Sequence, residues 1–273
     1  MRRLAFRFDI DTHKCIRDGV PKLLDISRQY DVPFTFFLNA GKAVSILDSL
    51  KKLYSKKSSS IEQYEMMSAM QKLGKIDYMI AAFINPRVSD YRSQIKQLLI
   101  SGCEVGLHGG RKHSAWGGNS ACWTIEKIRE ELKWALNVLR EIEPHFVPKG
   151  FASPEWSSPE CLSEILKELG FSYYADLRCL RQDPVKMGGT LPLIGVNLLG
   201  EPGGVAFFES CRVRNMTDDE IVHMVFDLFC ELETVILYDH PYYAGLNEAE
   251  CICRLIETAR DNKIQICKLE ELL

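Results

Sequence analysis

Short strand-like segments alternate with longer amphipathic segments along most of the chain, and this alternation limits the fold more than any other feature. Residues 34–38 form a continuous apolar run of the kind found in a buried parallel strand. Residues 124–141 instead carry leucine and isoleucine at helical spacing. Strands that alternate with helices are typical of a parallel α/β fold. We therefore expect a distorted (β/α) barrel of about seven parallel strands. The strand-like segments are 4–9, 34–38, 103–107, 146–151, 172–175, 205–209, 234–238 and 264–267.

One connection is much longer than the others. Residues 39–102 separate the second and third predicted strands, whereas a strand–helix connection in such folds takes about 2–6 residues. The segment contains apolar stretches at 66–70 and 78–84. It also contains a basic stretch made of Lys51, Lys52, Lys56 and Lys57. We expect a helical insertion over one end of the barrel, within a single domain that spans 1–273.

Charge and cysteine usage narrow the class of protein. The net charge of −3 gives no electrostatic reason to expect a nucleic-acid partner. The ten cysteines are scattered and form no Cys-x-x-Cys pair, which favours free thiols in a reducing compartment. No apolar stretch of the length of a secretory signal follows the first three residues, so we expect no leader, and no apolar run reaches about 18 residues. These observations predict a cytoplasmic protein that does not span a membrane.

Polar side chains follow several of the predicted strands at the point where each strand ends. Asp9 and Asp11 close the first strand, and His108 closes the third. Asp176 and His240 follow two later strands. Taken singly, an aspartate here is often a helix cap and a histidine is often structural. In a parallel barrel, however, all these strand ends meet at one face, so we expect the five side chains to converge.

Two histidines enclose a glycine-rich loop. His108 and His113 are the ends of the run His-Gly-Gly-Arg-Lys-His. Two imidazoles and a carboxylate from separate loops are a common ligand set for a catalytic divalent metal that keeps an open position. His13 is ambiguous because it lies only two residues after Asp11.

Several stretches resemble the polysaccharide deacetylase (NodB-homology) family. They are Arg7-Phe8-Asp9-Ile10-Asp11-Thr12, Arg17-Asp18-Gly19-Val20-Pro21-Lys22-Leu23-Leu24, and Glu104-Val105-Gly106-Leu107-His108 with Trp116 downstream. The positions of Asp176 and His240 fit the same pattern. The resemblance covers most of the chain in order, including the long insertion. It is strongest to the branch that contains the aminoarabinose-lipid deformylase.

The resemblance implies a metal-dependent hydrolase. Such an enzyme removes an acyl group, acetyl or formyl, from an amino sugar by cleaving a non-peptide C–N bond. Asp11, His108 and His113 would bind a divalent metal ion, with Zn²⁺ preferred. The ion would make a water molecule more acidic and polarise the acyl carbonyl.

The resemblance also assigns the proton transfers. Asp9 would be the general base that takes the proton of the attacking water. His240 would be the general acid that protonates the leaving amine, on the opposite side of the reacting carbon. Asp176 would be the carboxylate that orients His240 and tunes its pKa.

Two spacings differ from the usual family pattern. One additional residue separates His108 from His113, and Lys112 stands where the second imidazole normally lies. The two aspartates are separated by Ile10, as in the deformylase branch. Because side chains alternate along a strand, this spacing keeps both carboxylates on one face.

The arginine that usually precedes the proline of the third motif is absent. The corresponding run is Gly150-Phe151-Ala152-Ser153-Pro154-Glu155-Trp156. Arg7 lies on the same face as Asp9, and Arg178 lies near Asp176. Either arginine is a candidate for supplying the missing positive charge.

Two other interpretations remain open. Asp9-Ile10-Asp11-Thr12 also fits the first motif of haloacid-dehalogenase-like phosphatases, in which the first aspartate is the nucleophile. That interpretation needs a later acidic pair, for which Asp218-Asp219 is the candidate, and it gives the histidines no role. The second interpretation is a degenerate family member that binds a sugar without hydrolysing it.

The carrier of the sugar is left open between a nucleotide, a glycan and a polyprenyl phosphate. The deformylase branch acts on a sugar held on polyprenyl phosphate, which places the substrate at a membrane. Lysines 51–57 and the apolar stretches up to residue 84 would then contact the inner face of an anionic membrane. Alternatively, the apolar residues pack onto the barrel as a lid, and the lysines are solvated.

Overall fold

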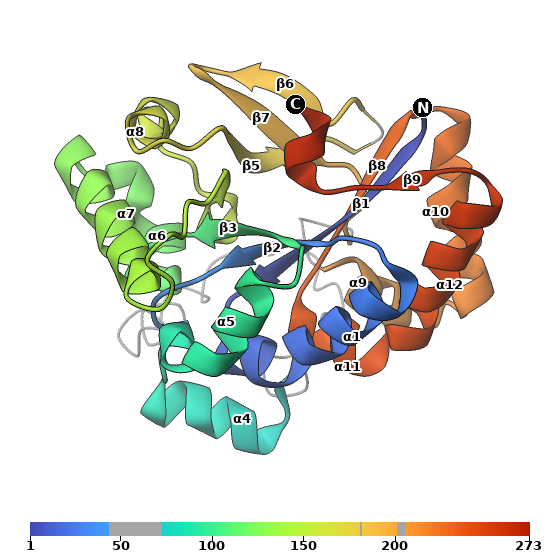
Figure 1. The fold of residues 1–273 in the computed structure, drawn as a ribbon, viewed down its shortest axis with the longest axis horizontal. Helices are drawn as coiled ribbons and strands as arrows, with labels where there is room; N and C mark the ends of the chain where they lie inside the picture. The colour runs from blue at the N-terminus through green and yellow to red at the C-terminus, as the bar shows by residue number, and fades with distance from the viewer. Residues whose placement is uncertain (44–72, 181, 201–205) are drawn as a thin grey trace, which may run out of the picture.

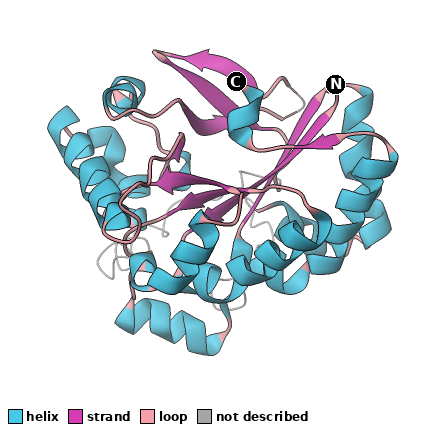
Figure 2. Cartoon of the chain, in the orientation of Figure 1, coloured by secondary structure: helices cyan, strands magenta, loops and turns pink. Residues whose placement is uncertain are grey.

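The computed structural model describes residues 1–43, 73–180, 182–200 and 206–273. A curled, mostly parallel sheet forms the centre of the molecule, with helices along its outer side (Figures 1 and 2). The sheet order is β6-β7-β5-β4-β3-β2-β1-β8, with β9 paired to β1. Its strands are β1 (Arg3–Ile10), β2 (Thr35–Leu38), β3 (Glu104–His108), β4 (Gly150–Ala152), β5 (Tyr173–Arg178), β6 (Val185–Gly188), β7 (Leu191–Val196), β8 (Thr234–Asp239) and β9 (Gln265–Ile266). This is the (β/α) barrel-like fold expected from the alternation of segments.

The sheet is curled so strongly that the segment after β7 pairs with β8 at the other edge. Leu198, just beyond β7, forms a parallel bridge with Leu237 of β8. The Leu198 amide donates to Ile236 O at 3.1 Å, and the Tyr238 amide donates to Leu198 O at 3.0 Å. The closure brings β8, near the end of the chain, to the same barrel interior as β5 and β7.

The longer helices cover the outer side of the sheet, as their amphipathic patterns require. They are α1 (Val20–Tyr30), α5 (Arg92–Leu99), α7 (Ile125–Arg140), α10 (Asp218–Asp227) and α12 (Ala249–Asp261). Shorter helical pieces are η1 (Cys15–Gly19), α4 (Lys75–Met79), η2 (Ile80–Ile84), η3 (Val88–Asp90), α6 (His113–Asn119), η4 (Ser120–Cys122), η5 (Pro154–Trp156), α8 (Leu162–Glu168), α9 (Phe207–Val213), η6 (Leu228–Cys230), α11 (Pro241–Asn247) and η7 (Leu269–Leu272). The Thr124 hydroxyl caps α7 by accepting from the Lys127 amide. None of the helices in the described part of the chain is long and apolar enough to cross a membrane.

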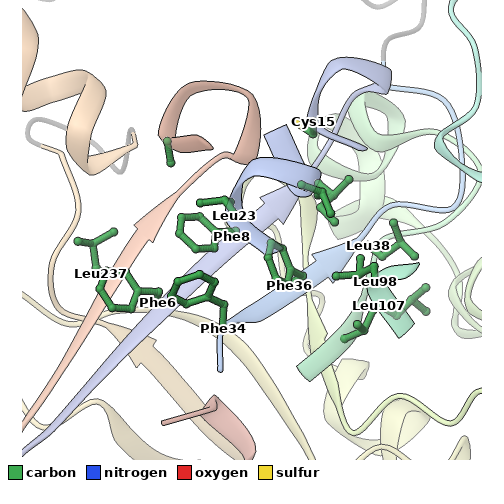
Figure 3. Close-up of a cluster of buried hydrophobic side chains, with 14 of the residues drawn as sticks. Phe6, Phe8, Cys15, Leu23, Phe34, Phe36, Leu38, Leu98, Leu107 and Leu237 are labelled. Carbon is green, nitrogen blue, oxygen red and sulfur yellow. The ribbon is translucent and has the colours of Figure 1, made fainter. Parts of the chain in front are cut away.

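Alternate residues of β1 lie in two different environments, the outer hydrophobic core and the barrel interior. Phe6 and Phe8 are fully buried between the sheet and its covering helices, where they meet Phe34 and Phe36 (Figure 3). The intervening residues of the strand, which include Arg7, face the barrel interior. One strand therefore supplies both the outer core and the polar groups inside the barrel.

The predicted strand at 205–209 is wrong, since residues 207–209 are the first turn of α9. Asp239 accepts a hydrogen bond from the Phe208 amide at 2.8 Å, which satisfies one of the unpaired donors at this helix start. A short apolar run does not by itself distinguish a buried strand from a buried helix.

The β6–β7 hairpin was not predicted. Its strands are antiparallel, and its turn contains Gly189 with φ +73°. The sequence Gly188-Gly189 is a known hairpin signal because glycine adopts positive φ without strain. The hairpin supplies the position in the sheet that the segment 205–209 was expected to fill.

The insertion is helical where the structure describes it. Residues 73–102 contain α4, η2, η3 and α5. The basic stretch at 51–57 and the apolar stretch at 66–70 lie outside the described residues.

Candidate active site

The predicted side chains converge at the carboxyl ends of the central strands. Asp9 is the second-last residue of β1 and Asp11 follows that strand directly, while His108 is the last residue of β3. His240 follows β8, and His113 is the first residue of α6. Residues more than two hundred positions apart therefore lie in one site.

Three of these side chains form a tight triangle of possible metal ligands. Asp11 Oδ1 lies 3.1 Å from His108 Nε2 and 3.3 Å from His113 Nε2. The two Nε2 atoms are 3.1 Å apart. Ligand atoms bound to one Zn²⁺ at about 2.0–2.2 Å lie roughly 3.3 Å apart in a tetrahedral site. Asp11 Oδ1 is also buried without a well-directed hydrogen bond within the described residues, so the donor set fits a divalent cation.

The surrounding backbone orients both imidazoles. His108 Nδ1 donates to Ala152 O at 2.9 Å, which leaves its Nε2 lone pair directed at the triangle. The His113 amide donates to Lys42 O at 2.9 Å, which anchors the start of α6. Gly109 has φ +73°, so the loop turns sharply after β3. The additional loop residue thus places His113, and not Lys112, beside His108.

Charge determines the protonation of the Asp11 carboxyl group. Burial would raise its pKa, but the charges of the His113 and His240 imidazoles and the close contacts with the His108 and His113 nitrogens hold this pKa well below its usual range. Burial likewise would lower the pKa of His108, yet the charges of Asp9 and Asp11 raise it. The site therefore favours an ionised carboxylate among imidazoles.

Arg7 holds Asp9 with a bidentate contact inside the barrel. Arg7 Nε donates to Asp9 Oδ1 at 2.9 Å, and Arg7 Nη2 donates to Asp9 Oδ2 at 2.8 Å. The guanidinium carbon lies 4.9 Å from the ring centre of Phe37, 4.5 Å from that of Trp156 and 5.2 Å from that of Tyr238. Of the two arginines considered in place of the missing third-motif arginine, Arg7 is the one in contact with Asp9. The aromatic enclosure could not be read from spacing, because its rings come from three separate segments.

His240 lies on the other side of Asp11. Its Nε2 is 3.2 Å from Asp11 Oδ2 and 3.2 Å from the Tyr238 hydroxyl. Burial would lower its pKa, but the charge of Asp11, the hydrogen bond to Asp11 and the charge of Asp239 raise the pKa of His240 to about 9. Asp239 accepts from the His240 amide at 2.7 Å, and burial raises the pKa of Asp239 to about 7. Tyr238 was not singled out by sequence reasoning; its only signal is its place two residues before His240.

Asp176 makes different contacts from those expected. Its Oδ1 accepts from the Ser153 amide at 2.6 Å, and its Oδ2 accepts from the Ser158 hydroxyl at 2.5 Å. Within the described residues, no hydrogen bond or ion pair joins Asp176 to His240. Burial raises the Asp176 pKa, opposed by the two serines and Arg7. The carboxylate therefore fixes the 153–158 segment that carries Trp156.

The acidic pair required by the phosphatase interpretation lies elsewhere. Asp218 pairs with Arg212, and Asp219 pairs with Arg254, at the start of α10. Asp218 also lies with Glu248 and Cys251 in a group of potential ligand atoms, but Arg212 contacts both carboxylates there. A guanidinium already balances these charges, and neither aspartate joins Asp9 and Asp11.

Comparisons with known proteins agree with this arrangement. Residues 2–174 match the model of the family described as "Polysaccharide deacetylase". A probable 4-deoxy-4-formamido-L-arabinose-phosphoundecaprenol deformylase (ArnD) of Shewanella sediminis is 25% identical over 283 residues, covering 99% of this chain and 86% of that protein.

Solved structures share the fold. A protein of Mycobacterium smegmatis assigned to the polysaccharide deacetylases superposes with a TM-score of 0.62 at 16% identity, covering 99% of this chain and 88% of its own. A pseudoenzyme of the CE4 family from Bacillus anthracis superposes with a TM-score of 0.56 at 12% identity, covering 99% of this chain and 65% of its own. With the matched family model covering more than half of its length, this chain belongs to the polysaccharide deacetylase family.

Proposed function

We propose that this protein is a metal-dependent hydrolase that removes an acyl group, formyl or acetyl, from an amino sugar. The observation that carries the proposal is the triangle of Asp11, His108 and His113 between two proton-transfer groups. Asp9, held by Arg7, lies on one side of this triangle, and His240 lies on the other. A sugar-binding protein without catalysis has no need of a base and an acid around one ligand set.

Asp11, His108 and His113 would hold the metal ion, for which Zn²⁺ is preferred because of the two imidazoles. When bound, such an ion supplies Lewis acidity, which polarises the acyl carbonyl and makes a water molecule more acidic. The backbone contact of His108 keeps its Nε2 available for this task. With only three protein ligands, a bound ion would keep coordination positions open for the substrate and the water.

Asp9 acts as the general base, and Arg7 acts as its positioning residue. The bidentate contact fixes the plane of the carboxylate, so Asp9 accepts the proton of the attacking water from one direction. His240 donates a proton to the leaving amine, while the Tyr238 hydroxyl restricts its ring. Asp176 acts at a distance from the reacting atoms, by holding the 153–158 segment against the site.

A formylated amino sugar on a polyprenyl phosphate is the proposed substrate, in line with the name of the Shewanella relative. The test is a metal-loaded enzyme assayed with N-formyl and N-acetyl amino sugars in free, glycan, nucleotide-linked and polyprenyl-phosphate-linked form, with formate or acetate as the measured product. Release of acid together with a free amine is expected. Saturable sugar binding without turnover would indicate a degenerate family member. Turnover of a generic phosphate ester alone would support the phosphatase instead.

We further propose that the protein works in the cytoplasm at the inner face of the membrane. The segment from α4 to η2 exposes large apolar side chains, among them Ile76 at 77%, Met79 at 52%, Phe83 at 72% and Ile84 at 69%. They do not pack on the barrel as a lid. A membrane interface is an environment in which such a surface gains by burial, and a substrate on a lipid carrier resides there. The ten unpaired cysteines fit a reducing compartment.

A further inference from the structure

We propose that Lys42, Arg87 and Lys112 form a binding site for the phosphate group that joins the amino sugar to its carrier. This inference rests on the proposed function, and it names the part of the substrate that the metal and proton-transfer groups do not touch. The three cations come from separate segments: one after β2, one before η3 and one before α6.

Backbone pairing brings the three residues side by side, and the Arg87 guanidinium carbon lies 6.0 Å from the ring centre of Trp134 in α7. Lys42 forms an antiparallel bridge with Arg87 and a parallel bridge with Lys112. The Val88 amide donates to Gly41 O at 3.2 Å, so the Lys42–Arg87 pair is of the non-hydrogen-bonded type. In such pairs the Cα atoms are about 4.5 Å apart and the side chains are closest.

The pairing with Lys112 is equally close. The Lys42 amide donates to Arg111 O at 3.0 Å, and Lys42 O accepts from the His113 amide at 2.9 Å. Lys112 lies between these two contacts and therefore directly opposite Lys42. Like charges placed opposite one another destabilise a strand pair unless an anion lies between them.

The nearby carboxylates are already engaged by other cations. Glu131 accepts from the Arg111 guanidinium at 2.8 Å and lies 2.7 Å from Lys127 Nζ. Asp90 accepts from the backbone amide of Arg87 at 3.0 Å, and not from its guanidinium. Within the described residues, the side chains of Lys42, Arg87 and Lys112 form no ion pair. The cluster therefore has a charge that no carboxylate of the described chain balances.

The cluster is joined directly to the candidate metal site. Lys112 precedes the ligand His113, whose amide is bonded to Lys42 O. Asn39 is fully buried; its Nδ2 donates to Asp11 O at 3.1 Å, and its Oδ1 accepts from the Gly41 amide at 2.9 Å. Two ligands of the metal site and the central lysine of the cluster are thus held by one short network.

A phosphate group suits these three cations better than a carboxylate group would. An arginine guanidinium can bind two phosphate oxygens at once, and the ammonium groups of two lysines can both bind a third phosphate oxygen. A sugar whose acyl amide lies at the metal site can carry its phosphate on the opposite side of the ring. Neutral glycans lack this group, so the cluster selects substrates with a phosphate-linked carrier.

The first experiment compares two substrates that differ only in the phosphate. The metal-loaded wild type and the variants Lys42→Gln, Arg87→Gln and Lys112→Gln are assayed with an N-formyl amino sugar 1-phosphate and with the methyl glycoside of the same sugar. The ratio of the two kcat/KM values should fall about tenfold in each variant, the effect of losing one charged hydrogen bond. Lys167→Gln, an exposed lysine of α8, is the matched control and should keep the wild-type ratio. An unchanged ratio in all three variants would overturn the inference.

A second measurement is independent of catalysis. Binding of the sugar 1-phosphate to the metal-free protein is measured by calorimetry in EDTA, where the Lys42→Gln variant should bind at least about tenfold more weakly. Equal affinity of variant and wild type would contradict the phosphate site. If the wild type binds the phosphate through Lys42 but hydrolyses neither substrate, the proposed deacylation fails while the phosphate site stands.

The carrier is identified by repeating the kinetic comparison with polyprenyl-phosphate-linked and nucleotide-linked forms of the same N-formyl sugar. Both carriers present the same phosphate chemistry to the cluster. The carrier that the wild type hydrolyses with the higher kcat/KM, and for which Lys42→Gln lowers that value, is the natural source of the phosphate. No loss in either arm would again contradict the inference.

Discussion

Arg7 is a fully buried cation that binds one carboxylate with two nitrogens and donates to Ala175 O with the third. It contacts both oxygens of Asp9 and lies among the rings of Phe37, Trp156 and Tyr238. Burial would lower its pKa, but the charge of Asp9 and its hydrogen bonds raise the Arg7 pKa further. A buried pair of this kind is costly to break, since removing one partner leaves an uncompensated charge. Arg7 therefore defines where the Asp9 carboxylate can point.

Replacing Arg7 by lysine tests this positioning role. Lysine keeps the charge but loses the bidentate geometry and the stacking on aromatic rings. We expect Arg7→Lys to retain the metal and lower kcat about 10–100-fold with little change in KM, the value of one or two charged hydrogen bonds. Asp9→Asn, which removes the base itself, should lower kcat by a factor on the order of 10²–10⁴. Near-normal kcat in Arg7→Lys, in protein shown to be folded by circular dichroism, would mean that Asp9 needs no such support.

The ligand role of His113 leads to a separate prediction. His113→Ala should remove most of the metal, because two ligands of a mononuclear site rarely retain the ion. Lys112→Ala is the matched control: this residue occupies the position of the usual second imidazole, yet its removal should leave the metal content near one ion per chain. Elemental analysis of both purified variants is the measurement. Full occupancy in His113→Ala, or metal loss in Lys112→Ala, would contradict the assignment.

At the scale of elements, α4 is fixed to the loop beside the site by a single carboxylate. Asp77 Oδ1 lies 3.1 Å from His13 Nε2 and 2.9 Å from Arg17 Nη2, and Asp77 Oδ2 lies 3.1 Å from Lys14 Nζ. Burial would raise its pKa, but these three partners lower the Asp77 pKa. With its polar side held in this way, the segment turns its apolar side chains to the outside of the molecule.

The outward apolar side of this segment is expected to bind lipid. Phe83→Ser combined with Ile84→Ser should reduce binding to anionic vesicles by about a hundredfold or more, because each exposed large apolar side chain contributes about 1.5–3 kcal/mol when buried. Met187→Ser is the control, since Met187 is 71% exposed on the β6–β7 hairpin. Vesicle flotation at low salt measures the effect. Wild-type protein that does not float with any vesicle would leave a soluble carrier as the better substrate.

At the scale of the whole molecule, a second buried polar group lies at the opposite end of the barrel from the site. Glu104, at the start of β3, accepts from the Thr35 hydroxyl at 2.9 Å, from the Glu270 amide at 3.1 Å and from the Tyr173 hydroxyl. These bonds join three strands to η7 near the C-terminus. Burial raises the pKa of Glu104, and the three donors oppose that rise only in part. The group supports the closed barrel and takes no part in the proposed chemistry.

Stability should therefore depend on pH through Glu104. Because its folded pKa is raised above the unfolded value of about 4.3, its contribution to stability is greatest below that pH and is lost as pH rises through the folded pKa. Tyr173→Phe removes a donor to the carboxylate, so it should lower the free energy of unfolding by about 1.5–3 kcal/mol at pH 8 and by less near pH 4. Urea denaturation at the two pH values measures this. A cost that is equal at both would show that the hydroxyl does not act through the charge of Glu104.

The alternation of strands and helices determined the fold class, because burial on both sides of a parallel strand requires apolar runs that can be read directly from the sequence. A different alternation, that of side-chain direction along a strand, placed Arg7, Asp9 and Asp11 on one face of β1, since this direction has a period of two residues. The convergence of His108 and His240 followed in the same way from their positions at strand ends.

Only the tertiary structure decided which side chains touch. Arg7, and not Arg178, is the partner of Asp9, and Asp176 bonds to Ser153 and Ser158 within the described residues. The pairing of Lys42 with Arg87 and Lys112 could not be predicted from the sequence either, because the three residues come from segments with no common periodicity. Spacing reports on local geometry within one element, whereas these contacts depend on how separate loops meet after the sheet has closed.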